Sequence, residues 1–226
     1  ANIEKIRAGG FNNMPYDAKG GAVVVTNVKT GEILAMASYP DYEPSVFYNG
    51  ISSSLLAEYN ERGVWTNKAT QSAYAPGSTF KMVTAIAGLQ EGAVSANEKI
   101  NDTGVYYVSD YYQPHCWYYD SYHIGHGPLN VSDAIKKSCN FFFYEVGSRI
   151  GIDNLARYGR FFGLGTKTGI ELTGEKAGTL ANREITEKWS IGDTVNASIG
   201  RSDGTLYMRN ISIQVNYEDV VVTKPT

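Results

Sequence analysis

The sequence contains few cysteines, few histidines and no long apolar run. Its two cysteines, Cys116 and Cys139, are too few for a disulfide scaffold, and either one disulfide or two free thiols is compatible with them. No stretch approaches the roughly 18 consecutive apolar residues of a membrane-spanning helix, and the first residues do not resemble a secretory signal segment. For these residues, the composition excludes a transmembrane helix and a disulfide-rich module.

Strong charge is also absent. The formal net charge is −3, which argues against an electrostatic nucleic-acid partner. The 226 residues are 42% hydrophobic, which is enough to bury one large core or two small ones. Twenty-four glycines and seventeen tyrosines exceed ordinary usage, and they predict a turn-rich fold with a half-wet aromatic surface or cleft.

The first clear structural signal is "GGAVVVTNVKTGEILAMAS" at residues 20–38. Two apolar runs flank "NVKTGE", in which Gly31 is free to adopt a positive φ angle. We therefore predict a β-hairpin central to a sheet. A short helix with a serine cap is expected from Ser52 to Glu61.

The stretch "YAPGSTFK" at residues 74–81 opens an amphipathic helix that is expected to run to Gln90. Residues three apart on a helix share a face, so Ser78 and Lys81 can meet. Ser78 has two interpretations at this point. It is either a helix cap beside a solvated lysine, or a nucleophile whose base is a lysine made neutral by burial.

Seven tyrosines, one tryptophan and all three histidines fall within residues 104–127, where a loop or ragged hairpin with an aromatic wall is expected. His115, Cys116, His123 and His126 suggest a zinc site, but their spacing fits no standard pattern. Surface histidines are the preferred interpretation, and neither a metal nor a cofactor is predicted.

Three helices are predicted after this segment, at residues 130–138 with Ser132 as cap, at 140–151, and at 152–165 from Asp153. Between the first two lies Ser138-Cys139-Asn140. A serine and an amide can relay a proton and hold a substrate amide, whereas Cys139 in the middle position is expected to face the core. Lys136 and Lys137 are expected to form a solvated helix face.

Long stretches of the sequence, including "NKATQSAYAPGSTFKMVTAIAGL" and "HGPLNVSDAIKKSCNFFFYEVGSRIG", resemble the transpeptidase domain of class B penicillin-binding proteins over roughly residues 20 to 200. Ser-x-x-Lys followed by Ser-x-Asn is the motif set known for this family, and its occurrence here is a match to that known pattern. The resemblance implies an α/β (α+β) fold, in which helices flank an antiparallel sheet beside a mostly helical subdomain. We expect one partial domain over 1–226, with segments 20–92, 93–165 and 166–226.

The resemblance also implies residue roles. Ser78 would be the acylated nucleophile, Lys81 its base, Ser138 a proton shuttle toward the leaving amine, and Asn140 the holder of the acyl-chain amide. The implied reaction is D,D-transpeptidation of peptidoglycan stems ending in D-Ala-D-Ala, without a cofactor and with β-lactams as inhibitors. Cell-wall synthesis proteins are the implied partners. The implied location is the outer face of a bacterial membrane, reached through an anchor outside these residues.

The third family motif, Lys-Thr-Gly on a strand, is not recognised. The tripeptide occurs at residues 29–31 in the hairpin turn and at 167–169 in a connecting segment, and we interpret both as unrelated to catalysis. After Gly200 the sequence departs from the family, and the tail "ISIQVNYEDVVVTKPT" suggests a substitute hairpin or a strand-exchanged oligomer. We expect this chain to be poorly active or inactive. A scaffold role and a β-lactam sensor or β-lactamase are the alternatives.

Overall fold

The computed structural model describes residues 19–185 and 188–201. These residues fall into two compact units, and each is considered by itself. The hairpin unit comprises residues 19–72 and 170–176, and the helical unit comprises 73–169, 177–185 and 188–201. The elements are β1 Gly21–Thr26, β2 Ile33–Tyr39, α2 Ser53–Arg62, α3 Lys81–Gln90, β3 Ile100–Asp102, α4 Trp117–Tyr122, β4 Gly127–Leu129, α5 Val131–Lys136, α6 Asn140–Phe161 and α7 Ile191–Ser198, with 3₁₀ turns at Pro44–Phe47, Gly77–Phe80 and Arg183–Ile185.

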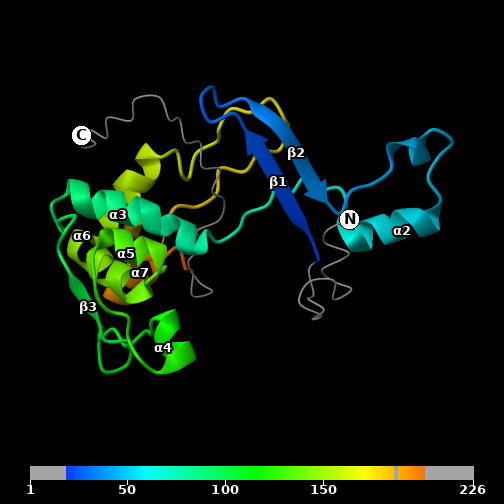
Figure 1. Ribbon diagram of the computed structural model, residues 1–226. Helices are drawn as coiled ribbons and strands as arrows, with labels where there is room; N and C mark the ends of the chain where they lie inside the picture. Colours follow the sequence, from blue (N-terminus) through cyan, green and yellow to red (C-terminus); the bar gives the residue numbers. More distant parts are fainter. Residues whose placement is uncertain (1–18, 186–187, 202–226) are drawn as a thin grey trace. The chain divides into compact units, whose positions relative to one another are not determined.

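The predicted hairpin is present in the hairpin unit (Figure 1). Strands β1 and β2 pair antiparallel from Gly21 opposite Tyr39 to Thr26 opposite Ile33, and Gly31 in the turn has a φ of 76°. Among the described residues the sheet contains these two strands only, so the expected central position in a larger sheet is not observed there. Helix α2 begins after Ser52, whose side chain accepts a hydrogen bond from Leu55 N, as predicted.

The core of the helical unit lies between its helices. Helix α3 packs against α6, and α6 packs against α7 (Figure 1). Close approach of α6 and α7 depends on Gly147, because a side chain there would collide with Ser198. Thr84 on α3 is buried, and its hydroxyl donates to the carbonyl of Ser198 at the end of α7 at 2.7 Å. This hydrogen bond joins α3 directly to α7. The largest fully buried side chains are Tyr144, Tyr158, Phe80, Phe142 and Phe143.

The predicted helices of residues 130–165 are present with two changes. Asn130, and not Ser132, caps α5, because its side chain accepts from Asp133 N at 2.9 Å. Helix α6 covers the first of the two later predictions and the second as far as Phe161, but Gly151 has non-helical backbone angles (φ 73°, ψ 167°) inside it. The predicted break at this glycine is therefore a kink between two helical halves.

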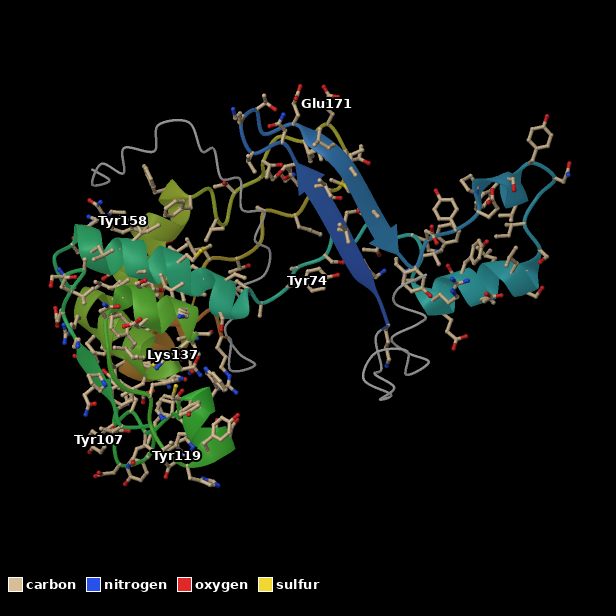
Figure 2. The ribbon with its side chains drawn as sticks, in the orientation of Figure 1. Tyr74, Tyr107, Tyr119, Lys137, Tyr158 and Glu171 are labelled. Atoms are coloured by element: carbon tan, nitrogen blue, oxygen red, sulfur yellow. The ribbon has the colours of Figure 1, made fainter. Side chains whose placement is uncertain are left out.

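Residues 104–127 form a ragged hairpin, as expected, with isolated bridges between Val105 and His115 and between Ser109 and Tyr112. Helix α4 in this segment was not predicted, and Figure 2 shows Tyr119 on it. Across the described ranges, no helix combines the length and apolarity needed to cross a bilayer. The predicted tail hairpin lies outside the described residues.

Candidate active site

Ser78 lies in the 3₁₀ turn Gly77–Phe80 that precedes α3, and it caps neither element. The residue at the cap position of the turn is Pro76, that of α3 is Phe80, and neither has a side-chain cap hydrogen bond. The turn is anchored from the end of α7, because Gly77 N donates to Gly200 O at 3.0 Å. Gly200 has a φ of 69°, and a side chain there would collide with the Gly77 carbonyl. The cap interpretation of Ser78 is therefore wrong.

Lys81 occupies the first position of α3, and its ammonium group lies among oxygens from the three other predicted site residues. Its Nζ is 3.2 Å from Ser78 Oγ, 3.1 Å from Ser138 Oγ and 2.6 Å from Asn140 Oδ1. It also donates to the Ser138 carbonyl at 2.8 Å. The structure thus brings together all four residues that the motifs indicated.

Ser138 reaches Lys81 because its backbone departs from helical geometry. It follows α5 with a φ of 50°, one of two non-glycine residues in the described ranges with a positive φ. That conformation costs about 1–2 kcal/mol for a residue with a side chain. It directs both the hydroxyl and the carbonyl of Ser138 to Lys81. Asn140 then opens α6, and its position at the helix start is fixed by Cys139 as the N-cap.

Burial controls the charge of Lys81. The side chain is 2% exposed, and the loss of water lowers its pKa to about 8, whereas the negative charge of Cys139 and Cys116 acts in the opposite direction. None of the four oxygens around the Nζ carries a formal charge. Desolvation without a directly bonded anionic partner is the environment that makes a lysine available as a base near neutral pH.

A cavity of about 490 Å³ opens beside these residues. Sequence reasoning missed two of its walls, Trp117 and Arg201. Trp117 begins α4, and its Nε1 donates to Lys137 O, which holds the indole next to the Ser138 turn. The aromatic wall expected for this segment was the only signal that pointed toward it. The lining residues are Ala75, Gly77, Ser78, Trp117, Ser138, Asn140, Ile199, Gly200 and Arg201.

Behind the cavity, four metal-ligating side chains converge in the interior: Asp102, Cys116, His126 and Cys139. Their ligand atoms all lie within 4.8 Å of one another. His126 Nδ1 is 2.7 Å from Asp102 Oδ2, and the Cys139 thiol donates to the same oxygen at 3.2 Å. The two sulfurs are 3.9 Å apart, and both cysteines are free thiols.

The ionisation of this cluster is set by its internal contacts. Burial opposes ionisation of Asp102, but hydrogen bonds from His126, Gly104 N and Cys139 hold the pKa of the carboxyl below its usual value. The contact with Cys139 lowers the pKa of Cys116, and the same contact together with burial raises the pKa of Cys139.

Two separations within the cluster match the edges of a tetrahedral ion site, whereas His126 Nδ1 and Asp102 Oδ2 are 2.7 Å apart, at hydrogen-bond distance. Zinc–sulfur bonds of about 2.3 Å and zinc–nitrogen bonds of about 2.0–2.1 Å require a sulfur–sulfur edge of about 3.8 Å and a sulfur–nitrogen edge of about 3.5 Å. The observed Cys116–Cys139 and Cys116–His126 separations are 3.9 and 3.5 Å. These residues can hold a zinc-class ion.

This cluster corrects the sequence-based view of the histidines. The side chain of His126 is only 3% exposed, so it is not the surface histidine that was expected, whereas His115 pairs with Asp120 on the surface. The four-residue combination weighed from spacing was also wrong, because Asp102 and Cys139 complete the set in place of His115 and His123. Cys139 is buried, as predicted.

A serine hydroxyl beside a desolvated lysine, with a second serine and an amide at the same nitrogen, defines a site suited to acyl transfer through a serine ester. The comparison with known families agrees with that class. Residues 21–212 match the family described as "Penicillin binding protein transpeptidase domain". The chain belongs to this family.

A D,D-transpeptidase and a sporulation protein are among the named relatives. The chain is 38% identical over 189 residues to the peptidoglycan D,D-transpeptidase MrdA of Escherichia coli K12, covering 80% of this chain and 29% of the relative. It is also 38% identical over 166 residues to stage V sporulation protein D of Bacillus subtilis, covering 73% of this chain and 24% of the relative. The chain thus spans less than a third of the length of these relatives.

Solved structures show the same fold. Pseudomonas aeruginosa PBP2 in complex with WCK 5153 matches with a TM-score of 0.77 and 30% identity, over 94% of this chain and 46% of that one. Helicobacter pylori PBP2 in complex with MreC matches with a TM-score of 0.77 and 26% identity, over 95% and 39%. The α+β fold predicted from the resemblance is therefore confirmed.

Proposed function

We propose that this chain carries the acylation site of a peptidoglycan D,D-transpeptidase, with Ser78 as nucleophile and Lys81 as its base. The observation that carries the proposal is the position of Lys81 Nζ, 3.2 Å from Ser78 Oγ and 3.1 Å from Ser138 Oγ. The names of the relatives and the family match support the substrate class.

The hydrogen bonds of Lys81 explain how it accepts a proton. A neutral amine has two N–H donors and one lone pair. The Ser138 carbonyl and Asn140 Oδ1 can only accept, so they take both donors. The lone pair is then left for the hydroxyl of Ser78 or of Ser138, because each hydroxyl can donate.

In the acylation step, Lys81 takes the proton of Ser78 as Oγ attacks the carbonyl carbon of the penultimate D-alanine. The carbon–nitrogen bond to the terminal D-alanine breaks, and the proton passes from Lys81 through Ser138 to the leaving amine. Asn140 presents its amide N–H to the acyl chain, because its Oδ1 is engaged with Lys81. In the transfer step, an amine of a neighbouring stem attacks the serine ester, and Ser78 regains a proton by the reverse route.

The proposal extends to inhibitors, partners and location. β-Lactams would acylate Ser78 as substrate analogues, in line with a relative solved as an imipenem acyl-enzyme complex, penicillin-binding protein A of M. tuberculosis. Cell-wall synthesis proteins are the proposed partners, in view of the relative solved with MreC and another solved in a peptidoglycan synthase complex. The proposed location is the outer face of a bacterial membrane, where such a substrate is found.

Fluorescent-penicillin labelling of the protein at its full natural length tests the assignment. We expect covalent labelling that is lost in Ser78→Ala and retained in Thr79→Ala, a matched hydroxyl deletion one residue away. Equal labelling of the Ser78→Ala variant would refute the assignment of the nucleophile.

The two alternative functions predict other outcomes of the same experiment. A scaffold would show no acylation of folded protein, whereas a β-lactamase would be labelled and would then lose the label rapidly. Transfer of the acyl group to a D-amino acid acceptor separates a transpeptidase from both.

A further inference from the structure

Arg201 carries the only formal charge among the described residues that line the cavity. The other lining groups are apolar, hydroxyl or amide groups, and no carboxylate is among them. Lys81, the nearby cation, is buried, and it acts as a base only in its neutral form. The cavity therefore offers a ligand one exposed positive charge, and that charge belongs to a residue that the acylation step does not use.

The backbone of Arg201 is fixed by the end of α7. Arg201 N donates to Asn196 O at 3.0 Å, and the preceding Gly200 carbonyl accepts from Gly77 N at 3.0 Å. Gly77 directly precedes Ser78. The main chains that carry the arginine and the proposed nucleophile are thus hydrogen-bonded to each other one residue away from both, and the position of Arg201 is fixed relative to Ser78.

The side chain of Arg201 is directed by Tyr144 on α6. Tyr144 is buried, and its hydroxyl donates to His115 O at 3.4 Å. Burial raises the pKa of Tyr144, whereas the charge of Arg201 and a hydrogen bond from its side chain act in the opposite direction. A guanidinium has five N–H donors, and one hydroxyl takes only part of them. Within the described ranges no carboxylate forms an ion pair with Arg201, so donors remain for an anionic ligand.

Tyr144 also indicates which part of a substrate lies near Arg201. It follows Asn140 by four residues on α6, and residues four apart are neighbours on one face of a helix. Asn140, whose Oδ1 is 2.6 Å from Lys81 Nζ, is the residue proposed to hold the amide of the acyl chain. The guanidinium is therefore on the acyl-chain side of the site, near the stem residues that precede the penultimate D-alanine.

We propose that Arg201 is a specificity-determining residue that binds a carboxylate on the acyl chain of the donor stem, the stem that forms the ester with Ser78. A carboxylate matches the planar fork of a guanidinium and accepts two parallel hydrogen bonds from it. This inference rests on the proposed function for its substrate, and it adds an acidic acyl chain, N-terminal to the penultimate D-alanine, as the preferred class.

Two penicillins that differ by one carboxylate provide the first test. Carbenicillin is benzylpenicillin with a carboxylate added to its acyl side chain, and both contain the ring carboxylate that corresponds to the terminal D-alanine. In the full-length protein, Arg201→Gln should lower the second-order acylation constant of carbenicillin about tenfold, as expected for the loss of a hydrogen bond between charged groups at an exposed site. The constant of benzylpenicillin should change less than about threefold. Arg160→Gln, at an exposed arginine of α6 that does not line the cavity, should leave both constants unchanged.

Charge reversal sharpens this test. Ampicillin carries an ammonium group where carbenicillin carries its extra carboxylate, so Arg201→Glu should reverse the preference in favour of ampicillin. Arg201→Lys keeps the charge without the planar fork, and it should retain part of the carbenicillin rate. Added salt should reduce the advantage of carbenicillin in the wild type but not in Arg201→Gln, because exposed charges are screened.

Two results of these kinetics would overturn the proposal. If carbenicillin and benzylpenicillin are slowed equally by Arg201→Gln, the guanidinium binds the ring carboxylate, and the acyl-chain assignment is wrong. If neither constant changes, Arg201 binds no substrate carboxylate.

Equilibrium binding separates this proposal from the proposed function. N-acetyl-L-Glu-D-Ala-D-Ala and its L-Gln counterpart are nearly isosteric, and neither can form a serine ester in Ser78→Ala. The Glu peptide should bind Ser78→Ala about tenfold more tightly than it binds the double variant with Arg201→Gln, whereas the Gln peptide should bind both alike. If the wild type is not acylated at all, the proposed function fails, and this difference in binding still decides the role of Arg201. If the wild type is acylated and the Glu peptide binds both variants alike, only the role of Arg201 is refuted.

Discussion

Lys81 and Asp102 are both 2% exposed in the helical unit, yet their neighbours differ. Lys81 is surrounded by neutral oxygens, and burial lowers its pKa to about 8. Asp102 accepts hydrogen bonds from His126, a backbone amide and a thiol, and its pKa stays below the usual value. The first environment disfavours the charged form of its residue, and the second stabilises it.

The two environments suit different roles, a reactive one for Lys81 and a structural one for Asp102. A buried amine with no directly bonded anion loses its proton easily and can serve as a base. A buried carboxylate with a full set of donors is an anchor, because removing any partner leaves the others unsatisfied. Cys139 lies between the two environments, and the main chain on either side of it supplies Ser138 and Asn140 to the reactive one.

The largest effect is expected from a substitution that weakens the hydrogen bonds around Asp102. Asp102→Asn removes the charge that faces His126 in a pair whose side chains are 1% and 3% exposed. Leaving a buried hydrogen-bonding group unsatisfied typically costs about 1–3 kcal/mol, more where a charged group is involved, and we expect a loss at the upper end of that range in urea unfolding. The matched control is Asp120→Asn, because Asp120 pairs with His115 on the surface.

The control should lose no more than about 1 kcal/mol, since exposed ion pairs contribute little. Equal losses in the two variants would mean that the Asp102 cluster does not anchor the helical unit.

The sequence alone was sufficient where the signal was local. The hairpin turn at Gly31, the serine cap of α2 and the break at Gly151 each follow from one residue type at one backbone position. The four residues of the proposed acylation site, which the structure brings together, were also indicated by the sequence, because Ser78 and Lys81 lie one helical turn apart and Ser138 and Asn140 lie two residues apart. The resemblance to a known family linked the two pairs.

The buried cluster could not be found in this way. Asp102 and Cys139 are 37 residues apart, and only packing of β3 near the start of α6 brings them together. Spacing within residues 104–127 instead favoured the nearby His115 and His123, which do not join the cluster. Helix α4 was missed because its six residues, most of them aromatic, carry a weak helical signal.

The environment of Lys81 predicts that the acylation rate depends on pH. Lys81 acts as a base only when neutral, so acylation should rise with pH and level off above about 8. Well below that midpoint the rate should fall about tenfold per pH unit. Because its folded pKa is lowered, Lys81 contributes stability that is present above its unfolded pKa and lost as the pH falls through about 8.

Stopped-flow acylation between about pH 6 and 9.5 brackets that midpoint and measures the first effect, and Lys81→Met should lack the slope. A flat profile in the wild type would show that Lys81 is not the base.

The smallest predicted effect distinguishes the backbone strain at Ser138 from the role of its hydroxyl. Ser138→Gly removes the hydroxyl that faces Lys81 and relieves the left-handed backbone at φ 50°, whereas Ser138→Ala removes the hydroxyl and keeps the strain. Both variants should lose acylation to a similar extent, but the glycine variant should be more stable than the alanine variant by about 1 kcal/mol. Thermal unfolding and acylation of the same two preparations measure both quantities. If the alanine variant is the more stable, the left-handed backbone of Ser138 does not destabilise the helical unit.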